Sequence, residues 1–242
     1  MLELLAVAAG LAGPGPRLDA QHLPALPQRG LVRELRNGVA LETLHGRPLG
    51  WIAGLRLATL PGVHGALFFD ARNRRLVIDF YERRVREVVS MNISAPRGCT
   101  FTDATSTELF VCGRVLKVRR AGRSHVVARA PTREGGSWLW AEFSRDRPAI
   151  LAQWSGQCET PTAFFVSGGK LRPLGGTTYR NAPESVGLGW LPGGRAVVHF
   201  TGGLCGNGYS GPGVYAVPLT GRPQLLLSVP ATPPQLLAMW GG

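Results

Sequence analysis

The chain has 242 residues, of which 44% are hydrophobic, and this is enough to bury a core and excludes a disordered chain. Its 33 glycines and 19 prolines are spread along the whole length, which favours many short strands joined by turns over long helices. The formal net charge is +12, but Lys117 and Lys170 are the only lysines among 27 basic residues. Such a skew to arginine is typical of a GC-rich genome, so we do not expect a nucleic acid as the partner.

The first segment of the chain is apolar and the next is rich in proline. Residues 1–13 resemble the h-region of a signal peptide, although Glu3 stands where basic residues are expected. Residues 13–29 are interpreted as a linker. We therefore expect residues 1–29 to precede one folded domain of residues 30–242. No other apolar run is long enough to span a bilayer, which excludes a polytopic membrane protein.

The first half of the chain contains several candidate hairpins. Residues 38–50 predict two strands around a His45-Gly46 turn. Residues 67–79 predict a second hairpin, which matches residues 100–112 at a shift of 33, and each continues into further strand signals. The first of these hairpins lacks the inner strands of its own unit.

The second half of the chain contains the clearest repeat, at a shift of 47 residues. Phe143 falls on Trp190, each is followed by a short apolar strand, and Cys158 falls on Cys205. Each unit consists of four strands over about 45 residues, which is the content of one blade of a β-propeller.

The last predicted strand, in residues 234–242, has no downstream partner. A propeller whose first blade is built from both chain ends would use it, because a ring must be closed by pairing its termini. The sequence therefore predicts an all-β fold, a β-propeller of about five four-stranded blades, with six blades as the alternative.

The repeat resembles the WD-like repeats of TolB-type β-propellers. The similarity is best in residues 189–227, with an aromatic residue, a glycine turn, a strand, Val-Tyr-Ala-Val and Leu-Leu, and it is fainter in residues 143–174. The Ser-Pro-Asp-Gly turn of that family is replaced here by residues 191–194 and 144–147. The resemblance implies the fold but carries no function across, since propellers of this kind bind many classes of ligand.

The four cysteines are interpreted as two disulfides. Cys99 and Cys112 would face each other in a hairpin centred on Thr105, and Cys158 and Cys205 occupy equivalent loops of adjacent blades. The alternative is four free, buried thiols. Two such bonds would indicate an oxidising compartment outside the cytoplasm, secreted, periplasmic or on the cell surface.

No catalytic, cofactor or metal site is predicted. Residues 206–211 match the Gly-x-Gly-x-x-Gly fingerprint, but a strand follows them where a helix is required, so they are interpreted as a loop. The histidines show no metal-binding spacing. The tryptophans are expected in the core, with an aromatic ligand platform as the alternative.

The charged residues are given structural interpretations. Asp70, Asp103 and Asp146 are expected to close turns at equivalent positions of three blades. The arginines of residues 72–75 and 83–86 are expected to form a solvated rim at turns and strand ends.

The function favoured by the sequence is non-catalytic binding of a protein or a small ligand at one face of an exported, monomeric bacterial propeller. The first alternative is a propeller enzyme of the lactonase or lyase type, which would need acids and histidines converging on the channel. The second is a basic surface that binds nucleic acid or another anionic polymer.

Overall fold

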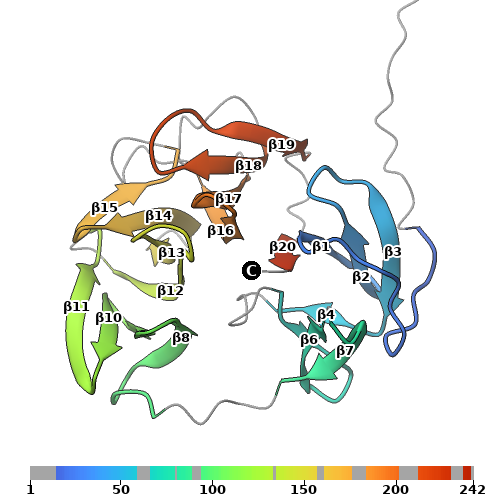
Figure 1. Cartoon of the computed structure of the whole chain (residues 1–242), viewed down its shortest axis with the longest axis horizontal. Helices are drawn as coiled ribbons and strands as arrows, with labels where there is room; N and C mark the ends of the chain where they lie inside the picture. Colours follow the sequence, from blue (N-terminus) through green and yellow to red (C-terminus); the bar gives the residue numbers. More distant parts are fainter. Residues whose placement is uncertain are drawn as a thin grey trace, which may run out of the picture.

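The computed structural model describes residues 15–58, 66–79, 81–88, 94–132, 135–156, 161–175, 184–201, 212–229 and 237–240. These residues form twenty strands and no helix, and the strands are grouped in five antiparallel sheets of four. The sheets are arranged around a central axis as the five blades of a β-propeller (Figure 1). The predicted fold class is confirmed, and the six-bladed alternative is wrong.

Blade 1 is built from both ends of the described chain. It consists of β20 (Leu237–Trp240), β1 (Gly30–Leu35), β2 (Gly38–Glu42) and β3 (Pro48–Ala53), in that order from the axis outward (Figure 1). The C-terminal strand is thus the innermost strand of the first blade, as the ring-closure argument predicts. The strand β1 was not predicted from the sequence.

Blade 2 consists of β4 (Arg56–Leu57), β5 (Phe68–Phe69), β6 (Arg75–Asp79) and β7 (Arg84–Glu87). Its innermost strand has only two residues, which is too short to give a periodic signal in the sequence.

Blade 3 consists of β8 (Thr100–Ala104), β9 (Glu108–Cys112), β10 (Val115–Arg120) and β11 (Arg123–Arg129). The hairpin β5–β6 therefore holds the second and third places of its blade, whereas β8–β9 holds the first and second. The predicted alignment of these hairpins at a shift of 33 residues is therefore wrong by one strand. The sequence does not reveal this, because every neighbouring pair of strands in a blade is an antiparallel hairpin with the same alternation of apolar residues.

Blade 4 consists of β12 (Gly136–Phe143), β13 (Ile150–Gly156), β14 (Pro161–Ser167) and β15 (Lys170–Pro173).

Blade 5 consists of β16 (Ser185–Leu191), β17 (Arg195–Phe200), β18 (Gly213–Pro218) and β19 (Gln224–Ser228). The 47-residue repeat matches these last two blades strand for strand.

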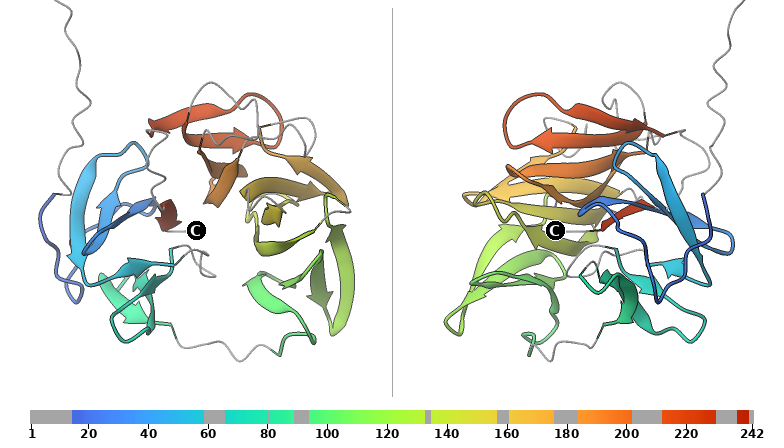
Figure 2. Two further views of the ribbon diagram at one scale, coloured as in Figure 1. Left: turned by 180° about the vertical axis from the view of Figure 1, so that it is seen from behind. Right: turned by 45° about the vertical axis from the view of Figure 1, so that its right-hand side comes forward.

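Hydrophobic clusters lie between neighbouring blades rather than within them. One cluster joins blades 1 and 2, and others join blades 3 and 4, blades 4 and 5, and blades 5 and 1. No cluster of the described residues joins blades 2 and 3, and the ribbons of these two blades are well separated in both views (Figures 1 and 2). The strand β20 contributes to two clusters, because Met239 packs toward blade 5 whereas Ala238 and Trp240 pack toward blade 2.

The described part of the Pro-rich segment, from Gly15 on, lies against blades 1 and 2. Leu18 donates a backbone hydrogen bond to Trp51 of β3 (2.8 Å), and Trp51 donates one to Pro16 (2.9 Å). Val85 of β7 donates to Ala20 (2.7 Å). The segment therefore satisfies backbone groups at the outer edges of two blades, which protects those edges from pairing with other chains. We call residues 15–29 the strap. A domain boundary at residue 29 stays a prediction.

Trp240 is the residue through which the closing strand is most firmly packed. Its side chain is 1% exposed, its indole Nε1 donates to the backbone oxygen of Pro27 (3.1 Å), and its ring lies against Gly30 so closely that a Cβ there would be 2.2 Å from a ring carbon. The ring can pack at this position only because residue 30 is a glycine.

Replacement of Trp240 by alanine should lower the free energy of unfolding by about 3–5 kcal/mol, because it leaves a cavity between blades 1 and 2 at the ring closure. Urea denaturation monitored by circular dichroism measures this. Tyr81→Ala is the matched control, since Tyr81 is fully exposed, and it should change the free energy by less than about 0.5 kcal/mol. Equal effects of the two variants would contradict the role of the closing strand.

Candidate functional site

The inner strands bring a group of charged residues to the axis of the ring. Three of these strands, β8, β12 and β16, carry a register shift against their second strands, at 101/103, 138/140 and 187/189 respectively. Such bulges change the direction of the following side chains and are common next to functional sites. The residues near these shifts are Asp103 and Glu142, which lie with Arg29, Arg145 and Trp190 in what we call the axial cluster.

Asp103 is a joint between blades 3 and 4. Its side chain is completely buried, and its carboxylate accepts hydrogen bonds from the backbone nitrogens of Ala104 and Phe143 (both 2.7 Å) and from Nη2 of Arg145 (2.8 Å). Arg145 also donates to the backbone oxygen of Ala104 (3.0 Å). Both carboxylate oxygens are therefore occupied by donors of the chain itself. A buried carboxylate held in this way has no oxygen left over for a ligand.

Glu142 is the second acid at the axis and has a different environment. Burial and, to a smaller extent, the charge of Asp103 raise the pKa of its carboxyl, and Arg145 and Arg29 oppose the shift, so that the net pKa is about 8. No donor among the described residues makes a hydrogen bond to this carboxyl. Its side chain is nevertheless only partly screened from solvent. At neutral pH the axis therefore presents a protonated carboxyl, which is both a donor and an acceptor.

Blades 4, 5 and 1 meet around Glu142. The indole Nε1 of Trp190 donates to the backbone oxygen of Glu142 (3.3 Å), and Nε of Arg29 donates to the backbone oxygen of Trp190 (3.1 Å). The side chains of Met239 and Glu142 pack against Gly189. A Cβ at residue 189 would be 2.6 Å from the Met239 methyl and 3.6 Å from Glu142 Oε2. The geometry of Glu142 is thus fixed by three blades.

The aspartates expected to close turns have different roles. Asp70 closes the β5–β6 turn as predicted, with its Oδ1 accepting from the backbone nitrogens of Arg72 and Arg74 (both 2.9 Å). The prediction is wrong for Asp103, which accepts from the backbone nitrogen of Phe143 in the next blade. Asp146 also contacts the next blade, because its carboxylate accepts from the backbone nitrogen of Gly193 (2.7 Å). Both of these aspartates fasten one blade to its neighbour, which a turn signal in the sequence does not reveal.

One histidine and five of the six tryptophans serve the core. His199 of β17 is 5% exposed, and burial lowers its pKa to about 4, so it is neutral in the fold. Of the six tryptophans, Trp51 is the one left partly exposed, and the guanidinium of Arg17 lies 5.8 Å from the centre of its ring. The other five are at most 4% exposed: Trp138, Trp140, Trp154, Trp190 and Trp240.

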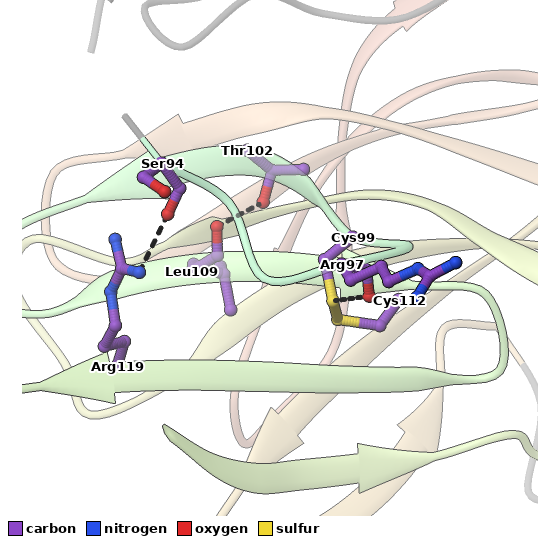
Figure 3. Close-up of a disulfide and its surroundings, with 7 residues drawn as sticks. All are labelled: Ser94, Arg97, Cys99, Thr102, Leu109, Cys112 and Arg119. Atoms are coloured by element: carbon purple, nitrogen blue, oxygen red, sulfur yellow. Dashed lines mark hydrogen bonds between the residues drawn. A yellow bond between two sulfur atoms is a disulfide. The ribbon is translucent and has the colours of Figure 1, made fainter. Parts of the chain in front are cut away.

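Cys99 and Cys112 are joined by a disulfide in blade 3 (Figure 3). The β8–β9 register pairs Thr100 with Val111, so the two cysteines face each other one step further from the turn, as the sequence predicts. Nearby, Thr102 Oγ1 donates to the backbone oxygen of Leu109 (3.3 Å). Cys158, Cys205 and the fingerprint of residues 206–211 lie outside the described residues.

Two features are absent from the described residues. These residues contain no group of three or more His, Cys, Asp or Glu side chains placed to hold a metal ion. They also contain no helix of the length and hydropathy required to cross a membrane.

Comparison with known proteins does not place the chain in a family. No family model matches it, and no curated protein is similar to it. The function must therefore be argued from the geometry.

The stability of the protein should fall as the pH rises from about 6.5 to 8. The pKa of Glu142 is higher in the fold than its ordinary value, so in this range the folded state holds a proton that the unfolded chain releases. Below pH 6.5 the lowered pKa of His199 acts in the opposite direction, because there the unfolded chain holds the extra proton. Glu142→Gln should remove about 1 kcal/mol of the fall, a figure discounted from ~1.4 kcal/mol per pKa unit because the Glu142 side chain is partly exposed. Urea denaturation at a series of pH values measures it. Glu82→Gln, on the exposed β6–β7 turn, should keep the wild-type slope, and a wild-type slope in Glu142→Gln would contradict the assignment.

Removal of the disulfide should destabilise the fold. Its two cysteines are 13 residues apart in the chain, and closing a loop of this length is worth roughly 3 kcal/mol in the chain-entropy account. Cys99→Ser/Cys112→Ser should therefore unfold at a lower urea concentration than the oxidised wild type. Reduction of the Cys99–Cys112 bond should lower the urea midpoint of the wild type, and the variant has no such bond to lose. Identical unfolding of the oxidised wild type and the variant would show that the bond contributes nothing.

Proposed function

We propose that the protein is a non-catalytic β-propeller, exported to the bacterial cell envelope, that binds a small ligand or a segment of a partner protein at the axial cluster. The observation that carries this proposal is that both carboxylate oxygens of Asp103 accept hydrogen bonds from the chain itself. An enzyme that uses a pair of acids needs both of them free to exchange protons with the substrate, and here only Glu142 is free in this sense.

Glu142 is the group that a ligand would contact. Its protonated carboxyl offers a donor and an acceptor in a setting of low polarity, and Arg29 and Arg145 lie near enough to influence its pKa. A polar group of a ligand that pairs with this carboxyl would gain from the same desolvation that raises the pKa. Polar groups of this kind, few and fixed in position, are typical of binding sites.

Export is supported by the Cys99–Cys112 disulfide, because such bonds persist in oxidising compartments. The signal-like residues 1–13 and the predicted pair of Cys158 with Cys205 would agree with it. The proposal also includes the TolB-like type of the repeat and a monomeric state. Peptide mapping of the secreted protein without reductant should recover both cysteine pairs. Four freely alkylated thiols in the unfolded, unreduced protein would end the case for export.

An enzyme of the lactonase or lyase type is the second candidate, and one observation favours it. A carboxyl whose pKa is raised to about 8 beside a second buried acid is an arrangement that enzymes use for proton transfer. Binding of nucleic acid through the arginines is the third candidate, and it would show as retention on heparin that falls steeply with salt.

A thermal-shift screen separates binding from catalysis. Candidate sugars, peptides and lactones are tested at pH 6 with the wild type and with Glu142→Ala. The proposal expects a compound that raises the Tm of the wild type, raises that of the variant less, and is recovered unchanged by mass spectrometry. A compound that is consumed, with turnover lost in both Glu142→Gln and Asp103→Asn, would show an enzyme instead.

A further inference from the structure

A groove at the outer rim of blades 1 and 2 collects arginines that are separate from the axial cluster. It has a volume of about 640 Å³ and is lined by Arg72, Arg74, Arg84 and Arg86, together with Asp70 and Glu87. A second hollow of about 490 Å³ shares Ala20 and Ala53 with it and continues along the strap. We call the first of these the rim groove.

The local structure fixes where these arginines stand. The carboxylate of Asp70 accepts from the backbone nitrogens of Arg72 and Arg74, so the β5–β6 turn holds both residues at the rim. Arg84 and Arg86 point to the same face of β7, two residues apart. The strap is held against β7 by the bond from Val85 to Ala20 (2.7 Å) and by one from the backbone nitrogen of Leu23 to the oxygen of Arg83 (2.6 Å).

The charges of the rim groove do not balance. Four guanidinium groups and two carboxylates line the groove, a formal charge of +2 for the lining alone. Arg74 is paired with Asp70 (2.7 Å) and lies 3.7 Å from Glu87. Arg84 and Arg86 are paired with Glu82 and Asp79, which do not line the groove, and the side chains of both arginines are about half exposed.

Arg72 has no such partner. No hydrogen bond or ion pair of its guanidinium is found among the described residues. The ion pair of Arg84 with Glu82 is exposed on both sides and contributes little to stability, so an incoming anion can replace it at small cost. The rim groove thus offers one free guanidinium and one that is readily exchanged.

We infer that the rim groove binds an anionic group, a phosphate or a carboxylate, of a ligand at the outer edge of the propeller. Arginine suits both groups because its planar fork donates two parallel hydrogen bonds. This inference concerns a different surface from the axial cluster, so each can fail without the other.

The test is a titration of the full chain with inorganic phosphate and, separately, with citrate, at constant ionic strength. Binding is followed by NMR through the Nε–H signals of the arginines. Saturable shifts confined to the arginines of the groove are expected, with a Kd on the order of 1 mM for a single anion. Saturation by phosphate indicates a phosphorylated ligand, and saturation by citrate alone indicates a carboxylate.

The matched variants remove the same charge from two places. Arg72→Ser/Arg84→Ser should weaken binding roughly tenfold, whereas Arg120→Ser/Arg123→Ser, on the exposed β10–β11 turn of blade 3, should leave it within about twofold. Equal loss in both variants would show attraction by net charge alone and would overturn the inference. Shifts spread over all surface arginines would also overturn it. So would the absence of any shift with either anion up to about 20 mM, which is well above a Kd on the order of 1 mM.

Discussion

The pairing of β20 with β1 is the interaction on which the ring depends. It is an antiparallel ladder from Gly30–Trp240 to Arg33–Leu237, and it is the point at which the last described strand joins the first blade. Because alternate residues of a strand point to opposite faces, this strand of four residues places Met239 in the cluster with blade 5 and Trp240 in the cluster with blade 2. Loss of the strand would therefore loosen two blade interfaces at once.

Polar joints near the axis add direction to the apolar packing. Asp103 fixes blade 3 to blade 4, Asp146 fixes blade 4 to blade 5, and Arg29 ties blade 5 to the chain just before blade 1. Hydrophobic burial is not directional, whereas these charge-assisted bonds specify how one blade is rotated against the next. The same joints hold Glu142 at the axis with a raised pKa, so the site is a consequence of how the blades are fastened.

The sequence predicted those features that depend on local pattern. Blades 4 and 5 were predictable because their hairpins keep nearly equal lengths, and the pairing of Cys99 with Cys112 follows from hairpin register alone. The strand β4 was not predicted because two residues show no periodicity. The packing of the strap was not predicted because its prolines favour an interpretation as a loop. The role of Asp103 depends on a contact with residues 40 and more positions away, which exists only in the closed ring. One signal was available: Glu142 is the only charged residue of the inner strand β12, and the 47-residue repeat aligns it with Gly189.

Hydrogen exchange of the backbone amides tests the ring closure most directly. Because β20 is an edge strand, only one of the adjacent amides of Ala238 and Met239 donates to β1. If β20 is an integral strand of blade 1, that amide should exchange as slowly as those of Val32 and Leu31, through opening of the whole domain. Free exchange of both amides, while the amides of β17 in blade 5 stay protected, would show that the ring holds without its last strand and would contradict this account.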